Sequence, residues 1–199
     1  MEKFSLERAL SLESKYDDSL QTRPIGNWLA TFVLWFSVFF ALYHYVTAGI
    51  GVPVDYWHMG AHMSGVIILI FISFPAFKKL KGVGQSPDLK GRLAGVPFYD
   101  WLFIIVGVMS SLYVGVTWYG IDLNFLGFSY SIPEQVLRMG VPLPIDVVFG
   151  TLLIIVLLEA VRRTIGIIVP IIILCFTGYA VLGPYIPIQI LKHPGLSWS

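Results

Sequence analysis

The chain alternates between long apolar runs and short polar breaks that contain glycine or proline. Each run approaches the ~20 residues that a helix needs to cross a hydrocarbon core ~30 Å thick. The pattern predicts an all-α integral membrane protein with about five transmembrane helices. Their expected bounds are Trp28–Ile50, His58–Phe77, Trp101–Tyr119, Ile145–Ala160 and Ile165–Gly183.

The last apolar stretch decides the number of spans. As a single helix at about 1.5 Å per residue, Ile145–Gly183 would be about 58 Å long, far more than one bilayer. Arg162, Arg163 and Gly166 suit a hairpin within it, which gives five spans. Four spans with an in-plane arm helix stay open as the alternative, because the fourth run is short.

Lysine and arginine are divided unequally between the two predicted sides of the membrane. Of 13 such residues, only Arg138 and Lys192 lie on one side. The others are Lys3, Arg8, Lys15, Arg23, Lys78, Lys79, Lys81, Lys90, Arg92, Arg162 and Arg163. Because basic residues accumulate on the cytoplasmic side, the N-terminus is predicted to be cytoplasmic and, with five spans, the C-terminus outside. The expected location is the bacterial inner membrane.

Composition agrees with membrane integration and excludes other classes. Of 199 residues, 56% are hydrophobic and only 13% charged, roughly half the charge of a soluble domain. A net charge of +1 offers no basic face for nucleic acid, and the one cysteine, Cys175, has no intrachain partner. The first residues lack the apolar core of a signal peptide. We therefore expect a cytoplasmic arm over residues 1–23 and a transmembrane domain over 24–199.

The connection after the third run has a pattern of its own. Ser131–Gly140 predicts a short helix, with Pro133 and Glu134 in its first turn and Arg138 in its last. The residues just before it are too apolar for free solvent, so this loop is expected to rest on the membrane or on a partner.

Ionisable residues in or beside a span are the first candidates for function in a membrane protein. Glu159 precedes Arg162 and Arg163 by three and four residues, the favoured orientation for ion pairs on a helix. Two interpretations are equally open: a charge cluster that docks a partner at the inner face, or a helix-end salt bridge. Asp146 opens the same helix, where capping of the N-terminus is the preferred interpretation.

Three histidines are expected at similar depth. His44 lies near the end of the first run, and His58 and His62 are four residues apart at the start of the second. Such a set can share a metal or contribute to a haem site. Only Asp55 accompanies them as a carboxylate, and histidines without a ligand are the preferred interpretation. No metal, cofactor or catalytic residue is assigned to the chain.

Small residues recur every fourth position on the third run, at Gly107, Ser111 and Gly115. This spacing lets helices approach closely. The candidate partner-interface residues are therefore Glu159, Arg162, Arg163, Gly107, Ser111 and Gly115.

The sequence carries no Ser-His-Asp set, glycine-rich phosphate loop or CxxC motif. The middles of its apolar runs are Phe, Leu, Ile and Val rather than the polar groups and broken helices of a transport path. We expect a scaffold subunit rather than an enzyme or a transporter that works alone.

The most specific segment of the chain runs from Leu158 to Gly166 and has the pattern LEAxRRxxG. Further distinctive segments are Arg138–Pro142, Asp146–Gly150, Tyr179–Pro187, His193–Ser197, Lys15–Asp17 and Arg23–Gly26. Together they resemble the small-subunit region of TRAP (tripartite ATP-independent periplasmic) transporter permeases of the TAXI type. The resemblance covers most of the chain.

The resemblance implies a sodium-driven importer of organic acids, such as dicarboxylates or glutamate-like compounds, delivered by a periplasmic TAXI-type binding protein. In that family the large permease subunit holds the substrate and sodium sites and moves as an elevator, while the small subunit helps to hold the scaffold. TAXI permeases are commonly one fused chain, so the large subunit is expected either as a separate chain or as the continuation of this one. The alternative is a haem-binding membrane-anchor subunit of a redox enzyme that uses the histidines.

Overall fold

The computed structural model describes residues 22–23, 25–51, 55–76, 92–93, 95–125, 127–138 and 140–196. Most of the predicted arm, and Lys78, Lys79, Lys81 and Lys90 of the predicted basic connection, lie outside these residues.

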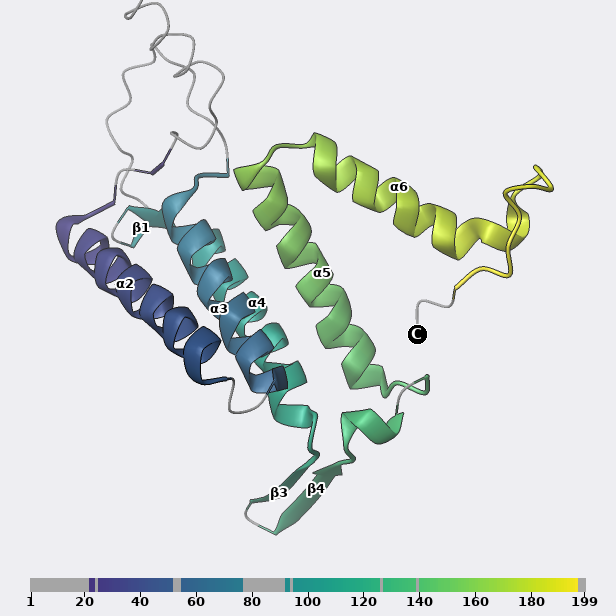
Figure 1. Cartoon of the computed structure of the whole chain (residues 1–199), viewed down its shortest axis with the longest axis horizontal. Helices are drawn as coiled ribbons and strands as arrows, with labels where there is room; N and C mark the ends of the chain where they lie inside the picture. The colour runs from purple at the N-terminus through teal and green to yellow at the C-terminus, as the bar shows by residue number, and fades with distance from the viewer. Residues whose placement is uncertain are drawn as a thin grey trace, which may run out of the picture.

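Five helices make up most of the described chain (Figure 1): α2 (Asn27–Ile50), α3 (Asp55–Ser73), α4 (Phe98–Thr117), α5 (Pro144–Thr164) and α6 (Ile168–Leu182). All five are long and apolar enough to cross a membrane, when α6 is counted with the turn that follows it to Tyr185. The number of helices and their approximate positions are as the apolar runs predict.

The helix ends differ from the predicted ones by up to four residues, and the two largest differences have a clear structural basis. α3 ends at Ser73, before Pro75, whereas the sequence predicted a helix as far as Phe77, which lies outside the described residues. α5 extends four residues beyond its predicted end. Arg162 and Arg163 belong to its last turn, where their side chains pair with Glu159 one turn earlier on the same helix. The chain then turns at Gly166, whose φ of +112° suits glycine.

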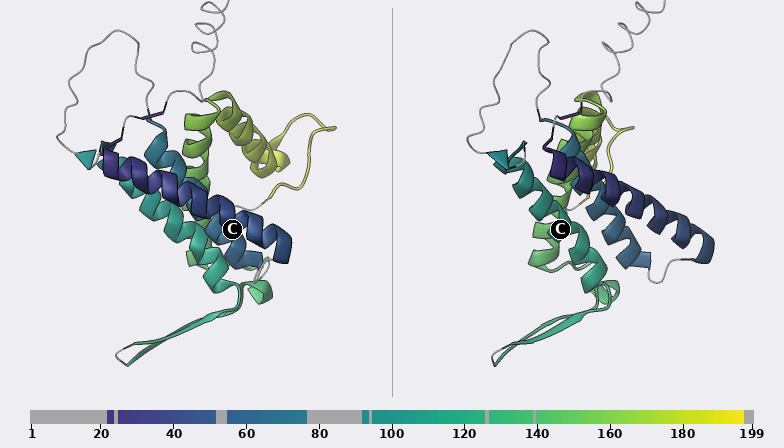
Figure 2. Two further views of the ribbon diagram at one scale, coloured as in Figure 1. Left: turned by 60° about the vertical axis from the view of Figure 1, so that its left-hand side comes forward. Right: turned by 90° about the vertical axis from the view of Figure 1, so that its left-hand side faces the viewer.

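The core lies where α3, α4 and α5 meet (Figure 2). Its most buried side chains include Ile67 and Phe71 from α3, Ile104 from α4, and Val156 and Ala160 from α5. α3 and α4 lie side by side over most of their lengths, and α5 packs against both. Three of the five helices therefore form a closely packed unit.

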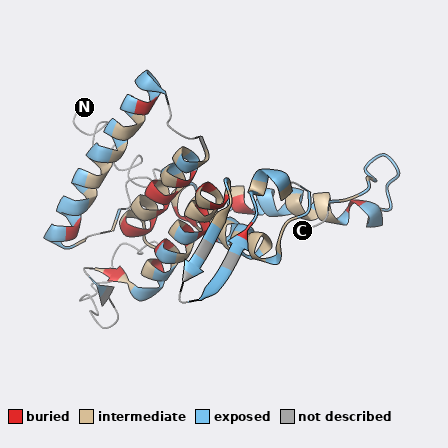
Figure 3. Ribbon diagram, turned by 90° about the horizontal axis from the view of Figure 1, so that it is seen from below, coloured by how far each residue is buried: buried red, intermediate tan, exposed pale blue. Residues whose placement is uncertain are grey.

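α2 and α6 are held less tightly. In the α2 range only Leu29 and Thr47 are buried, and in α6 only Pro170. Figure 3 shows α2 at the rim of the bundle, mostly exposed, and Figure 1 shows α6 diverging from α5 beyond the turn that joins them. This divergence is compatible with a fifth span or with an arm helix, so the alternative number of spans stays open.

Two short strand pairs interrupt the helices, so the prediction of an all-α chain is wrong in these connections. β1 (Arg92–Leu93) pairs with β2 (Val96–Pro97), and β3 (Ile121–Phe125) pairs with β4 (Phe128–Ile132), both antiparallel. Ser131 and Ile132, expected to begin a helix, instead pair with Asp122 and Ile121. The predicted helix is reduced to η2 (Gln135–Arg138), because the tight turn at Gly127 brings two polar–apolar alternating segments together. A second short turn, η3 (Gly183–Tyr185), follows α6.

Candidate functional site

The last two turns of α5 carry the predicted charge cluster. The Glu159 carboxylate accepts hydrogen bonds from Arg162 Nε at 2.7 Å and Nη2 at 2.8 Å, and from Arg163 Nε at 2.7 Å. The three side chains share one helix face because they are three and four residues apart. The contacts that the sequence predicted are therefore present.

The cluster continues into the interior through a residue that the sequence analysis did not single out. Asp100, in the first turn of α4, is completely buried, and its Oδ1 lies 2.7 Å from Nη1 of Arg163. Arg23, just before α2, donates from Nη2 to the other oxygen of Asp100. The side chains of Arg23 and Arg163 are only 6% and 1% exposed. We call these five residues (Arg23, Asp100, Glu159, Arg162 and Arg163) the α5 charge cluster.

Arg163 is also enclosed by aromatic rings and backbone carbonyls. Its guanidinium carbon lies 4.5 Å from the centre of the Phe71 ring and 5.8 Å from that of Phe103, an arrangement that favours a cation. Its Nη1 and the Arg23 Nη2 both donate to the carbonyl of Phe74, beyond the end of α3. The α5 charge cluster thus joins the segment before α2 to the ends of α3, α4 and α5.

Only part of the cluster reaches the surface. The side chain of Arg162 is 31% exposed and that of Glu159 19% exposed, and Arg162 also donates to the carbonyl of Ala76 at 2.8 Å. The side chains of Glu159 and Arg162 are therefore accessible to another molecule, whereas that of Arg163 faces the interior. Contact of this cluster with a partner stays a prediction.

The small residues of α4 lie inside the chain. Ser111 Oγ is 2.7 Å from Ser64 Oγ on α3. A Cβ added to Gly107 would come within 2.9 Å of Ile67 and Val156, and one added to Gly115 within 3.0 Å of the Tyr56 carbonyl oxygen. Gly107, Ser111 and Gly115 are all buried and bring α3, α4 and α5 together. Any surface offered to a partner must therefore come from other residues.

A second polar group lies at the opposite end of α5. The backbone N–H of Leu143 donates to Asp146 Oδ2 at 2.7 Å, which is the predicted capping contact. The sequence analysis missed the two other donors to this carboxylate. They are Tyr113 of α4, at 2.6 Å, and Arg138 of η2, which also donates to the Pro133 carbonyl. This carboxylate fixes the connection between α4 and α5.

The three histidines come together between α2 and α3. A ring nitrogen of His44 lies 3.0 Å from one of His62, and the His58 ring makes an edge contact with His44 at 5.2 Å between ring centres. Within the described residues, no group of three or more His, Cys, Asp or Glu side chains is arranged to hold a metal ion.

One groove opens between the diverging helices α5 and α6. It has a volume of about 350 Å³, and its lining includes Gly150, Thr151, Thr177 and Ala180. In the described structure, a Cβ added to Gly150 or to Gly178 would meet no atom within 4 Å. In contrast to the glycines of α4, which are covered by neighbouring helices, Gly150 and Gly178 leave the backbone of α5 and α6 uncovered by other described residues.

Taken together, the charged positions of the five helices lie within two turns of a helix end: Asp55, Asp100, Asp146, Glu159, Arg162 and Arg163. Such an arrangement suits the fixing of helix ends and provides no charged group at the centre of the bundle.

Compared with protein-family models, curated proteins and solved structures, the chain matches none of them. The resemblance to TRAP permeases therefore depends on the sequence segments alone.

Proposed function

We propose that this chain is the small scaffold subunit of a sodium-driven TRAP-type transporter for organic acids. One observation carries the proposal: α3, α4 and α5 form a closely packed unit whose helix ends are joined by buried ion pairs and whose centre has no charged group. A closely packed unit of this kind suits a scaffold that stays still while another subunit moves. It does not suit a protein that must replace the hydration shell of a carboxylate in mid-membrane.

The segment that carries the family resemblance supports this role. LEAxRRxxG lies at the end of α5, and its Glu159 and Arg163 belong to the α5 charge cluster. The same cluster includes Arg23, which belongs to another of the resembling segments. In our proposal these residues hold the scaffold together.

In this proposal, the chain is a multi-pass protein of the bacterial inner membrane with a cytoplasmic N-terminus. Its partners are a large TRAP permease subunit, which would hold the substrate and sodium sites, and a periplasmic TAXI-type binding protein. The groove between α5 and α6 supports this assembly, because the open backbone at Gly150 in its lining allows another helix to approach closely, and Gly178 of α6, outside the groove lining, is equally open.

Transport assays test the proposal. In liposomes with an inward sodium gradient, the chain alone should take up no radiolabelled dicarboxylate or glutamate. Addition of the large subunit and the loaded binding protein should produce uptake, and collapse of the gradient should abolish it. Saturable uptake by the chain alone would refute the scaffold role. Failure of the complete set to transport any organic acid that its binding protein binds would refute the proposed family.

The second candidate is a haem-binding anchor subunit, and it rests on the three clustered histidines. Two axial ligands bind on opposite faces of a haem, whereas ring nitrogens of His44 and His62 touch at 3.0 Å. In this arrangement the pair leaves no space for a macrocycle. An absorption spectrum after addition of haemin distinguishes the two functions, because bound haem with histidine ligands gives a sharp, shifted Soret band.

A further inference from the structure

The contact between α2 and α3 contains a chain of titratable side chains near the 52–54 connection. The hydroxyl of Tyr43 lies 2.7 Å from Nδ1 of His58, and Nε2 of His44 lies 3.0 Å from Nδ1 of His62. The four rings also touch: the His44 ring centre is 4.8 Å from that of His62 and 5.1 Å from that of Tyr43. Two side chains from each helix thus form one polar contact in otherwise apolar surroundings.

The His44–His62 contact sets a limit on protonation. A hydrogen bond between two imidazole nitrogens needs one N–H group and one lone pair. Two neutral rings, or one neutral and one protonated ring, meet this requirement. Two protonated rings do not, because each nitrogen then carries a hydrogen and each ring a positive charge. We propose that His44 and His62 form a proton-sensitive latch, which holds this end of α2 on α3 until both imidazoles are protonated.

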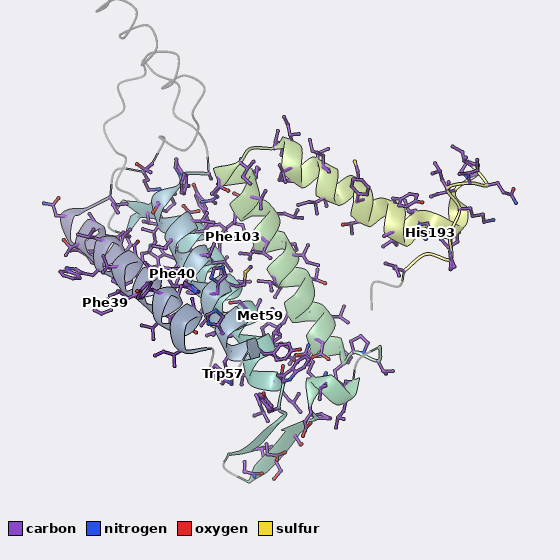
Figure 4. The ribbon with its side chains drawn as sticks, in the orientation of Figure 1. Phe39, Phe40, Trp57, Met59, Phe103 and His193 are labelled. Carbon is purple, nitrogen blue, oxygen red and sulfur yellow. The ribbon has the colours of Figure 1, made fainter. Side chains whose placement is uncertain are left out.

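The packing of α2 explains why two side chains can control this end of the helix. Leu29, at the opposite end, is the one fully buried apolar residue in the α2 range. Near the latch, the ring of Phe40 occupies the space above Gly65 of α3 and stacks on His62 at 5.7 Å between ring centres. Figure 4 shows Phe40 between α2 and α3, whereas Phe39 lies on the outer face of α2 and is 66% exposed. Apart from the Phe40 ring, the described hydrogen bonds and ring contacts between α2 and α3 in this region are those of Tyr43 and the histidines.

The surroundings contain no described charge that could neutralise a doubly protonated pair. The titratable groups that face His44 and His62 are Tyr43 on α2 and His58 on α3. Asp55, one turn before His58, has a side chain outside the described part. Asp146, at the start of α5, is already paired with Tyr113 and Arg138. Repulsion between two imidazolium groups therefore acts directly on this contact and favours separation of α2 from α3 at this end.

A distance measurement on the full chain in lipid nanodiscs tests the latch. Spin labels are attached at V46C on α2 and M59C on α3, both at exposed positions, in a C175S background because Cys175 is exposed. Between about pH 8 and about pH 4, which extends below the ordinary range of histidine because the charge on one ring opposes protonation of the other, the inter-label distance should shift reversibly to longer values. A distance that does not change with pH would overturn the proposal.

Histidine variants test whether the change in inter-label distance depends on His44 and His62. His44→Gln with His62→Gln can still form hydrogen bonds but cannot gain charge, so its inter-label distance should be the same at both pH values. His193→Gln, which changes the histidine on the C-terminal segment, away from the latch, should keep the full shift. An equal shift in the double variant would overturn the proposal. If the double variant does not fold, His62→Gln alone is decisive, because one titratable ring cannot form the doubly charged pair.

Discussion

The carboxylate of Asp100, in the first turn of α4, is completely buried against the guanidinium of Arg163, in the last turn of α5, at 2.7 Å. This contact joins two residues far apart in the sequence and fixes the relative position of two helices. Arg23 on one side and Glu159 on the other complete the neutralisation of both groups. A buried pair of this kind is strongly destabilising when one member is removed, because the other charge is left in a medium that solvates it poorly.

We therefore expect Asp100→Asn to lower the stability of the chain by roughly 3–5 kcal/mol. The substitution keeps the shape of the side chain but leaves Arg23 and Arg163 without their shared anion. Thermal unfolding in detergent, followed by circular dichroism, measures the effect. Asp122→Asn is the matched control, because Asp122 is exposed on β3. Equal unfolding midpoints for the two variants would show that the buried contact does not contribute to stability.

Two glycine substitutions should have opposite outcomes. Gly107→Ala places a methyl group 2.9 Å from Ile67 and Val156, and overpacking of this kind costs about 1–3 kcal/mol. Gly178→Ala meets no neighbour and removes the conformational freedom of a helical glycine, so the isolated chain should be unchanged or up to about 1 kcal/mol more stable. The same thermal measurement compares them. A destabilised Gly178→Ala variant would contradict the open α6 face.

Substitutions of the two arginines of α5 should have different effects, one on the stability of the chain and the other on its association with the large subunit. Arg163→Ala removes an interior cation and should lower the unfolding midpoint, whereas Arg162→Ala disrupts a partly exposed pair, a type worth only about 0–1 kcal/mol. If Arg162 contacts the large subunit, less of that subunit should co-purify with the Arg162→Ala variant than with the Lys192→Ala variant. Equal recovery would leave Glu159 and Arg162 as a helix-end pair only. Comparison with Lys78→Ala plus Lys79→Ala, outside the described residues, extends the test to the predicted basic connection.

The unequal distribution of basic residues predicts the topology. Reporter fusions after Ile50, Leu126 and Ser199 should be periplasmic, and fusions after Gly84 and Arg163 should be cytoplasmic. The fusion at Ser199 also decides what the diverging helix α6 does. A cytoplasmic reporter there would exclude five spans and favour four spans with an arm helix.

The sequence by itself determined the helices and the local ion pairs. Apolar runs of sufficient length predicted five helices, because hydrophobic length is a property of consecutive residues. Glu159 was correctly joined to Arg162 and Arg163, and Asp146 to the start of α5, because helical spacing alone brings these groups together. The close packing suggested by Gly107, Ser111 and Gly115 is present for a related reason: residues four apart share one face of a helix.

Only the tertiary structure decided what each of these faces meets. Spacing along one helix does not reveal that the partner of Gly107 is the chain's own α3, or that Arg163 turns inward to Asp100. The β3–β4 hairpin was missed although both of its segments alternate between apolar and polar residues, a pattern typical of strands, because the pairing itself is a contact between two short segments across a turn. His44 and His62 meet only because α2 folds back on α3. Contacts within a helix follow from its repeat, whereas contacts between helices depend on how the whole chain packs.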